Sequence, residues 1–358
     1  MIIKKKSVTF LDRNENQYGP SPACFKALHN SNGNTLQSYS RDFTKGIKSS
    51  LSERLAIDFG IDEKRILLGY GSEDILKQSV QCYISKDDKI MIPSYSWWYY
   101  KKIAGEAEGI NIHYPIVEGE DTFYYDIEGM LKVYEEQKPK MVLISSPNNP
   151  TGNRLEIEQL NFVLDKMKET VVVLDEAYSL FDETYNTNPV SLVKRYPNLI
   201  IIRTFSKYYG LAGIRTGFAF LGDNHERVCL LNSRYLGFNR LSEKIAIAAL
   251  DSHEYYNLMR KKIAADMEML FNELNQISGF QAYRSHANFI LLKIPVDIRD
   301  SLKEYLTERG MIVKFMNEDG LSNHIRITVG THIQNCMLLK LLRSFMNEKR
   351  KHEQVQRV

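Results

Sequence analysis

The sequence predicts an α/β protein: a large domain with a mostly parallel sheet wrapped by helices on both faces, and a smaller α+β domain at the C-terminal end. Two observations lead to this fold class. Between about residue 40 and residue 230, short apolar runs alternate with helical patterns, and uninterrupted apolar runs are typical of parallel strands buried on both faces. After residue 285, short apolar segments separated by polar loops favour a second sheet.

The order of the expected elements follows from these runs. Strands of the large sheet are expected at 66–68, 89–92, 141–144, 171–174 and 199–202. Helices are expected at 242–250, 255–274 and 331–346, strands of the smaller sheet at 288–292, 311–313 and 325–327, and a frayed charged tail at 348–358. The chain is therefore expected to comprise an N-terminal arm (1–35) that covers the functional site, a large domain (36–235) and a small domain (236–358).

Length, charge and cysteine content argue against several classes of protein. A chain of 358 residues can bury two cores, and a net charge of +3 is too small to suggest nucleic-acid binding. The start lacks the apolar core of a signal peptide, and no apolar run is long enough to span a membrane. The scattered cysteines lack the paired spacing of a zinc site or a disulfide framework, which favours a reducing, cytoplasmic location and no metal: Cys24, Cys82, Cys229 and Cys336.

The most informative segment is 204–215, Thr-Phe-Ser-Lys-Tyr-Tyr-Gly-Leu-Ala-Gly-Ile-Arg. An isolated lysine is usually a solvated surface charge. Lys207, however, follows the buried strand at 199–202 and precedes mostly small or aromatic residues, so we expect its amine to point into a closed site. A lysine that loses hydration there becomes available as a neutral nucleophile toward carbonyl groups. The segment therefore predicts a Schiff-base lysine, and such lysines usually serve pyridoxal phosphate.

Pyridoxal phosphate needs a carboxylate beside its ring nitrogen, because the ring withdraws electrons only when that nitrogen is protonated. Asp175 ends the expected strand at 171–174, and α/β proteins bind ligands at the carboxyl ends of parallel strands. Taken alone, Asp175 could equally cap a helix. Together with Lys207 it predicts the partner of the pyridinium nitrogen. Tyr178 is the expected hydrogen-bond partner of the ring hydroxyl, and ordinary aromatic packing is its alternative.

The ring hydroxyl also needs a neutral donor. The strand at 141–144 leads into the segment 147–152, Pro-Asn-Asn-Pro-Thr-Gly. Its two prolines restrict the backbone on either side of the asparagines, so the amide of Asn149 can be held in one orientation. An Asn-Pro turn by itself is common, whereas the whole segment after an apolar strand predicts a binding site.

The cofactor phosphate needs backbone N–H groups and a cation. The strand at 66–68 is followed by Gly71, Ser72 and Glu73 at the start of a helical pattern, and glycine allows the backbone to approach an anion closely. This pattern alone is weak evidence, since about half of such turns bind nothing. We expect Ser206 and Arg215 to contact the same phosphate.

The flat face of the cofactor needs an aromatic neighbour. Residues 95–100, Tyr-Ser-Trp-Trp-Tyr-Tyr, follow the strand at 89–92, and so many aromatic side chains would be a liability on an exposed helix. Tyr95 lies nearest the strand end and is expected to stack on the ring. The other aromatic residues, Trp97 and Trp98 among them, are expected in the core or at a subunit interface.

The chain resembles fold-type I, pyridoxal-phosphate-dependent aminotransferases of the histidinol-phosphate aminotransferase group. The resemblance runs from about residue 11 to residue 331 in the order of that family and is highly specific as a set. The matching motifs are Asn-Glu-Asn at 14–16, Gly-Pro-Ser-Pro at 19–22, Gly-Ser-Glu-Asp at 71–74, Pro-Ser-Tyr at 93–95, Pro-Asn-Asn-Pro-Thr-Gly at 147–152, Asp-Glu-Ala-Tyr at 175–178, Ser-Lys at 206–207, Gly-Leu-Ala-Gly at 210–213, Arg215, and Ile-Arg-Ile-Thr-Val-Gly at 325–330.

The resemblance implies an activity and roles for single residues. It implies transamination between a small amino acid or amino-alcohol phosphate and a 2-oxo acid such as 2-oxoglutarate, with the cofactor on Lys207. It implies that Arg326 binds the anionic end of the substrate, together with Asn16 and Lys314. It also implies a homodimer with shared active sites, in which Tyr39 reaches the cofactor phosphate of the neighbouring subunit.

The chain departs from the family pattern at two places. Tyr39 is followed by serine where the family usually has proline. Lys314 occupies a position where the family often has arginine, and lysine acts as a point charge whereas arginine binds phosphate or carboxylate with two parallel hydrogen bonds. The departure at Lys314 leaves open whether the substrate is histidinol phosphate or a related amine.

Two other functions are alternatives to transamination. The same scaffold could decarboxylate a phosphorylated amino acid such as phosphothreonine or phosphoserine, if the bond to the carboxylate stood perpendicular to the cofactor ring. A regulatory module that only binds the cofactor is disfavoured, because Lys207 is present and no DNA-binding helix-turn-helix extension is attached. The expected partners are therefore a small amino donor and a keto-acid acceptor, without nucleic acid or membrane.

Overall fold

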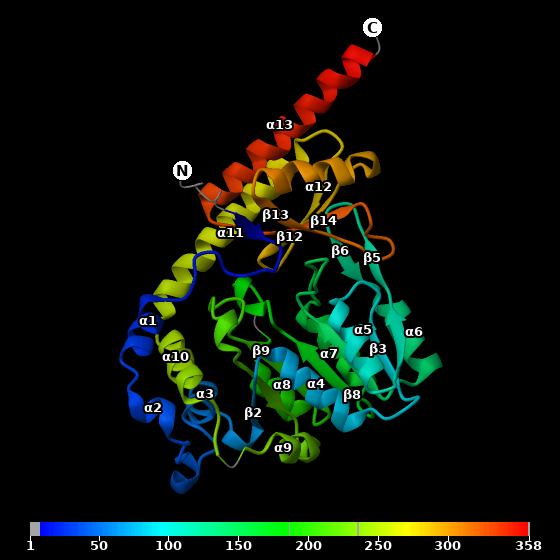
Figure 1. Cartoon of the computed structure of the whole chain (residues 1–358). Helices are drawn as coiled ribbons and strands as arrows, with labels where there is room; N and C mark the ends of the chain where they lie inside the picture. The colour runs from blue at the N-terminus through cyan, green and yellow to red at the C-terminus, as the bar shows by residue number, and fades with distance from the viewer. Residues whose placement is uncertain (1–7, 186, 235, 357–358) are drawn as a thin grey trace.

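The structure, a computed structural model, describes residues 8–185, 187–234 and 236–356. Its described part consists of a large and a small α/β unit, as the sequence predicts. In Figure 1 the large sheet lies in the lower half, the smaller sheet lies above it, and the long helix α11 (His253–Asn275) runs along one side from one to the other.

The large sheet has seven strands in the order β2-β10-β9-β8-β7-β3-β4. Its strands are parallel except β10, which pairs antiparallel with both β2 and β9. All five strands expected from apolar runs are present, and β4 and β10 add to them. The bounds are β2 (Ile66–Gly69), β3 (Lys89–Pro93), β4 (Ile110–Tyr114), β7 (Met141–Ser145), β8 (Val171–Asp175), β9 (Leu199–Thr204) and β10 (Gly217–Leu221).

Helices cover both faces of this sheet, which is the physical reason for its uninterrupted apolar strands. In β7, Met141 and Leu143 pack on one face with side chains of α4 and α5, whereas Val142 and Ile144 pack on the other face with side chains of α7 and α8. The helices of the large unit are α3 (Ser50–Phe59), α4 (Ser72–Tyr83), α5 (Trp98–Glu106), α6 (Ile127–Gln137), α7 (Ile157–Lys166), α8 (Pro189–Arg195) and α9 (Glu226–Asn232).

The smaller sheet has the order β1-β13-β14-β12-β11 and is backed by the long C-terminal helices. The three strands and three helices expected there are present. Their neighbours β1, β11 and α12 were not expected. The bounds are β1 (Thr9–Leu11), β11 (Gln281–Tyr283), β12 (Phe289–Lys293), β13 (Met311–Phe315), β14 (His324–Thr328), α10 (Arg240–Leu250), α12 (Arg299–Glu308) and α13 (His332–Gln356).

Part of the N-terminal segment, which the sequence predicts to be an arm, forms a strand of the smaller sheet. Strand β1 pairs in parallel with β13, Thr9 N–H donates to the carbonyl of Gly310 (2.8 Å), and Leu11 is fully buried. The predicted boundaries near 35 and 235 remain predictions, and residues 1–7 and 235 lie outside the described chain. Helix α1 (Pro22–His29) packs beside α10. The remaining helix and strands are α2 (Gly33–Gln37), β5 (Ile116–Glu118) and β6 (Phe123–Tyr125).

The charged tail was predicted to fray, and this prediction is wrong for the described residues, because α13 continues to Gln356. Residues 347–356 contain neither glycine nor proline, and most of them favour a helix. Contacts with other elements also support the helix: Lys349 pairs with Asp297, and the Tyr305 hydroxyl donates to Glu348 (3.3 Å). Residues 357–358 lie outside the described chain. None of the described helices combines the length and apolarity needed to cross a membrane.

Candidate active site

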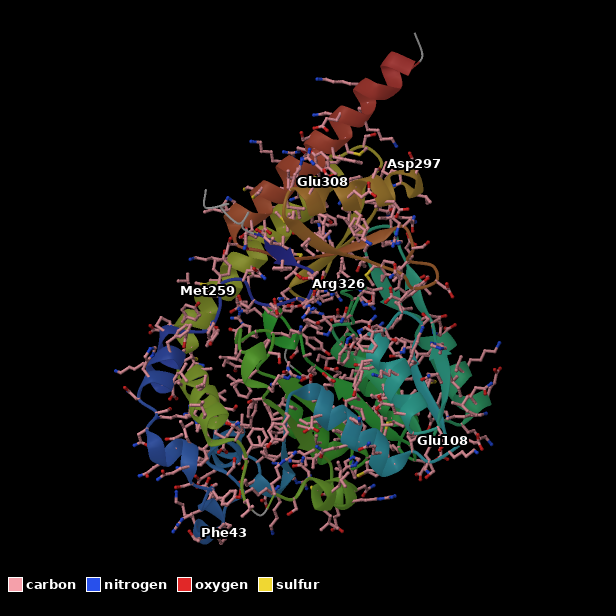
Figure 2. The ribbon with its side chains drawn as sticks, viewed as in Figure 1. Phe43, Glu108, Met259, Asp297, Glu308 and Arg326 are labelled. Carbon is pink, nitrogen blue, oxygen red and sulfur yellow. The ribbon has the colours of Figure 1, made fainter. Side chains whose placement is uncertain are left out.

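A cavity of about 590 Å³ lies between the large and small sheets. Its lower wall is formed by loops that follow β2, β3, β7, β8 and β9, so five strand ends converge on it. Figure 2 shows Arg326, on the smaller sheet, at the junction of the two units. The predicted site residues that line this cavity are Ser72, Glu73, Asn149, Asp175, Tyr178, Lys207, Lys314 and Arg326.

Lys207 follows β9 and is half-buried at the cavity wall. Its Nζ donates to the backbone carbonyl of Arg13 (2.8 Å) and lies 5.8 Å from the centre of the Tyr178 ring. The loop after it packs tightly on the N-terminal segment: a Cβ at Gly210 would lie 2.8 Å from the carbonyl carbon of Gly19, and Gly210 has a positive φ of 65°. Glycine is therefore required there to keep the lysine in place.

Asp175 is the last residue of β8 and is buried, with 7% of its surface exposed. One carboxylate oxygen accepts a hydrogen bond from the Tyr100 hydroxyl (2.9 Å), and the other accepts one from the N–H of Ala177 (3.0 Å). Burial raises the pKa of Asp175 above its ordinary value, and these two hydrogen bonds act in the opposite direction. Within the described chain it forms no direct ion pair with a lysine, arginine or histidine, although the charge of Lys207 on the same cavity wall also lowers its pKa.

Tyr178 and Asn149 lie on the same cavity wall. The Tyr178 hydroxyl accepts a hydrogen bond from the side-chain amide of Asn14 (2.9 Å), and its ring is buried. Asn149 presents its side-chain carbonyl to the Arg326 guanidinium, which donates to it. Asn14 also lines the cavity and has a positive φ of 57°, a feature that the sequence did not reveal.

Gly71, Ser72, Glu73 and Arg215 come together at the start of α4. Gly71 has a φ of 86°, and a Cβ there would lie 2.7 Å from Nη2 of Arg215. The same guanidinium lies 3.6 Å from a carboxylate oxygen of Glu73, and both side chains are about half exposed. Ser206 is buried in the loop that follows β9. Its hydroxyl accepts a hydrogen bond from the Thr204 hydroxyl (3.0 Å). Free N–H groups of the first helical turn and a cation therefore lie side by side.

Tyr95 is not among the residues that line the cavity, and its stacking on a cofactor ring stays a prediction. Its ring packs edge-on against Phe123 (5.9 Å between centres), and its hydroxyl lies beside Gly320 in the loop after β13. Trp97 and Trp98, which are expected in the core or at a subunit interface, line the cavity. The sequence located the aromatic segment correctly, but the turn into α5 decides which side chains face inward.

Asn16 is also absent from the cavity wall. Its side-chain amide donates to the backbone carbonyl of Tyr208 (2.8 Å), and its carbonyl accepts from the N–H of Tyr18 (3.1 Å). Asn16 therefore links the N-terminal segment to the loop that carries Lys207, and its contact with substrate stays a prediction.

Arg326 and Lys314 form the cationic upper wall. They are directly opposite each other on the paired strands β14 and β13. Arg326 is 9% exposed and donates to Asn149 and to the carbonyl of Asp12 (2.6 Å), and burial lowers its pKa. Its Nε has no hydrogen-bond partner, and among the described residues no carboxylate pairs with it. Lys314 is exposed to the cavity, so two adjacent cations are available to an anion.

Tyr39 lies away from this cavity. It is 71% exposed and belongs to a surface depression that Ser38, Ser40 and Arg41 also line. Its predicted contact with a neighbouring subunit stays a prediction.

Comparisons with known proteins show the family of the chain. Residues 6–343 match the family described as aminotransferase class I and II. The histidinol-phosphate aminotransferase of Ruminiclostridium cellulolyticum is 34% identical over 81% of this chain and 79% of its own length. Histidinol-phosphate aminotransferase 2 of Archaeoglobus fulgidus is 33% identical over 94% of this chain and 93% of its own.

The chain belongs to the class I and II aminotransferase family. The solved histidinol-phosphate aminotransferase of Sinorhizobium meliloti, in complex with pyridoxal-5'-phosphate, has the same fold, with a TM-score of 0.84, 23% identity, and coverage of 95% of this chain and 92% of that one. The protein is thus a pyridoxal-phosphate-dependent aminotransferase that acts on amino and keto acids.

The residues of this aminotransferase fit that cofactor. The buried carboxylate of Asp175, which has no direct ion-pair partner among the described residues, suits a protonated ring nitrogen. Lys207 suits an aldehyde, and the close approach of Arg215 to Gly71 suits a phosphate. Tyr100, whose hydroxyl orients Asp175, is a functional residue that the sequence did not single out. The aromatic run pointed to its segment, but nothing in the sequence marked which of its residues meets the carboxylate.

Proposed function

We propose that this aminotransferase moves the amino group of a phosphorylated amine related to histidinol phosphate to a 2-oxo acid such as 2-oxoglutarate. The observation that carries the proposal is the cationic pair Arg326 and Lys314, which lies across one cavity from Lys207 and Asp175. A substrate with an amine at one end and an anion at the other fits this distribution of charge. The names of the similar enzymes support the same class of substrate.

The proposed roles follow from the contacts. Pyridoxal phosphate, when bound, supplies an aldehyde that takes up the amino group and a ring that withdraws electrons. Lys207 holds the cofactor and then accepts and returns the proton of the substrate Cα, a function typically worth roughly 10²–10⁴-fold in rate. Asp175 keeps the ring nitrogen charged, and Tyr100 holds its carboxylate in position.

Other residues bind and orient. We propose that Asn149 and Tyr178 contact the ring hydroxyl. Trp97 or Trp98, which line the cavity, stacks on the cofactor ring in place of Tyr95. Ser72 and Arg215, with Ser206, bind the phosphate. Arg326 binds the α-carboxylate of the donor or the phosphate of the second substrate.

We further propose a cytoplasmic homodimer. The support is the resemblance to dimeric enzymes and the exposure of Tyr39, which on this chain has no contact with its own cavity. In the dimer Tyr39 would reach the cofactor phosphate of the other subunit.

One experiment separates transamination from decarboxylation. The holoenzyme is mixed with glutamate, and the visible spectrum of the cofactor is followed. We expect the aldehyde form to convert to the amine form, and 2-oxoglutarate to appear in equal amount, since glutamate leaves its amino group on the cofactor. A panel of phosphorylated amines and keto acids then identifies the second substrate. An unchanged spectrum with glutamate, together with carbon dioxide release from phosphothreonine or phosphoserine, would support the decarboxylase instead.

The anion site gives a second prediction. Arg326→Gln should lower kcat/KM for a phosphorylated substrate roughly 10- to 100-fold, because it removes charged hydrogen bonds from a buried site. This factor corresponds to a loss of about 1.5–3 kcal/mol of transition-state stabilisation. Lys314→Ala should cost less, since Lys314 is exposed and its charge is screened. Lys303→Ala, on the outer helix α12, is the matched control. Equal kinetics for Arg326→Gln and wild type would refute the anion site.

A further inference from the structure

A cysteine, a histidine and an aspartate form a connected group outside the active site, where α13 begins against α11. Cys336 Sγ lies 3.6 Å from Nε2 of His332, one helical turn earlier on α13. The other ring nitrogen of His332, Nδ1, lies 2.6 Å from a carboxylate oxygen of Asp266 on α11. Asp266 is buried, with 4% of its surface exposed, whereas Cys336 is exposed.

The arrangement fixes the direction of the hydrogen bonds. A carboxylate can only accept, so Nδ1 of His332 carries the proton that Asp266 accepts. In the neutral ring the lone pair is then on Nε2, which faces the thiol of Cys336. A thiol whose proton can pass to an oriented imidazole is the arrangement that activates cysteine nucleophiles.

The contacts of Asp266 leave His332 as its basic partner. His332 is the basic side chain that pairs with Asp266 within the described chain, and the Tyr18 hydroxyl, 3.5 Å away, is a neutral donor. The ammonium of Lys262, which lies 5.6 Å from the centre of the Tyr18 ring, forms no ion pair with Asp266. A buried carboxylate is stabilised by a cation. Moving the proton of Cys336 to His332 supplies that cation and leaves a thiolate at the surface.

The other cysteines lack this environment. Cys24 and Cys82 are buried. Cys229 is partly exposed, and its sulfur lies 3.8 Å from the backbone carbonyl of Lys64. Neither the buried pair nor Cys229 has a histidine among its described hydrogen-bond partners.

We propose that Cys336 is a nucleophilic thiol and a site of modification by small disulfides. The Cys336 thiolate attacks one sulfur of the disulfide RS–SR, and a new S–S bond joins Cys336 to RS. The S–S bond of the reagent breaks, RS⁻ leaves with the electron pair, and it takes the proton held by His332. Cysteine is thereby oxidised to the mixed disulfide, and one half of the reagent is reduced to RSH.

The test measures thiol reactivity of the intact holoenzyme at neutral pH. Dithiodipyridine is added, release of its chromophore is followed, and the labelled peptide is identified by mass spectrometry. We expect one fast phase that maps to Cys336 and is absent from Cys336→Ser. His332→Gln should slow this phase at least about tenfold, because the thiol loses its proton acceptor while its exposure is unchanged. Dithiothreitol should restore the free thiol.

His253→Gln is the matched control, because it removes a surface histidine at the start of α11 that has no cysteine partner among the described contacts. It should react at the wild-type rate. Asp266→Asn should also slow the fast phase, and circular dichroism of this variant shows whether the loss is one of folding. If His332→Gln reacts as fast as wild type, Cys336 is merely exposed and the proposal is wrong. A fast phase that maps to Cys229 would overturn it equally.

Discussion

Replacement of Lys207 by alanine is expected to lower turnover by about 10⁴-fold or more, the upper end of what one proton-transferring group contributes. The loss combines two functions, since the same amine holds the cofactor and moves the proton at the substrate Cα. The variant should keep its fold, because Lys207 is half-buried and its side chain makes one described hydrogen bond, to a backbone carbonyl. Steady-state kinetics and thermal unfolding of the purified variant measure both expectations.

Two further measurements make the Lys207 prediction sharper. Borohydride reduction of the wild-type holoenzyme should attach the cofactor covalently to the peptide that contains Lys207, and Lys207→Ala should take up no label. Lys194→Ala, an exposed lysine on α8, is the control and should retain full turnover. Label on another lysine, or substantial turnover by Lys207→Ala, would mean that the nucleophile has been misidentified.

Replacement of Asp175 by asparagine is expected to give a protein that binds the cofactor but loses most of its activity. The amide keeps the shape of the carboxylate, so the hydrogen bond from Tyr100 can survive, but the charge facing the ring nitrogen is gone. Loss of one partner from a buried ion pair costs about 3–5 kcal/mol, which corresponds to a rate decrease of roughly 10²–10⁴-fold if the whole loss affects the chemical step.

The kinetics of Asp175→Asn should show the loss mainly in kcat, with cofactor content unchanged by absorbance. Asp300→Asn, at an exposed position on α12, serves as the control and should behave as wild type. Retention of kcat within a few-fold by Asp175→Asn would show that this carboxylate does not act on the ring nitrogen.

Much of the fold could be predicted because burial on both faces leaves a direct trace in the sequence. Residues 141–144 and 199–202 are wholly apolar because helices cover both sides of their strands, and a run of that kind has few other structural explanations. Strand β1 left no comparable trace. Its partner β13 lies some 300 residues later in the chain, and only the folded structure brings Thr9 to Met311.

The candidate site likewise contains some residues that the sequence predicts and others that only the structure identifies. Lys207 and Asp175 directly follow or end apolar strands, so their meeting at one sheet edge could be inferred from the chain alone. The choice between Tyr95 and Trp98 could not be inferred from the chain alone, because a turn of a few residues decides which ring faces the cavity. The candidate side chains also have similar chemistry. The role of Asn16 likewise depends on a backbone carbonyl, that of Tyr208, which carries no sequence signal.

The amino-acid sequence by itself determined the α/β class, the order of the main strands and the chemical groups that pyridoxal phosphate requires. It could do so because strand burial and reactive side chains are properties of short segments. The tertiary structure decided which side chains share the cavity, that Arg326 is buried opposite Lys314, and that Cys336, His332 and Asp266 form one hydrogen-bonded group. Those features depend on distances of a few ångströms between segments far apart in the chain, and packing alone sets such distances.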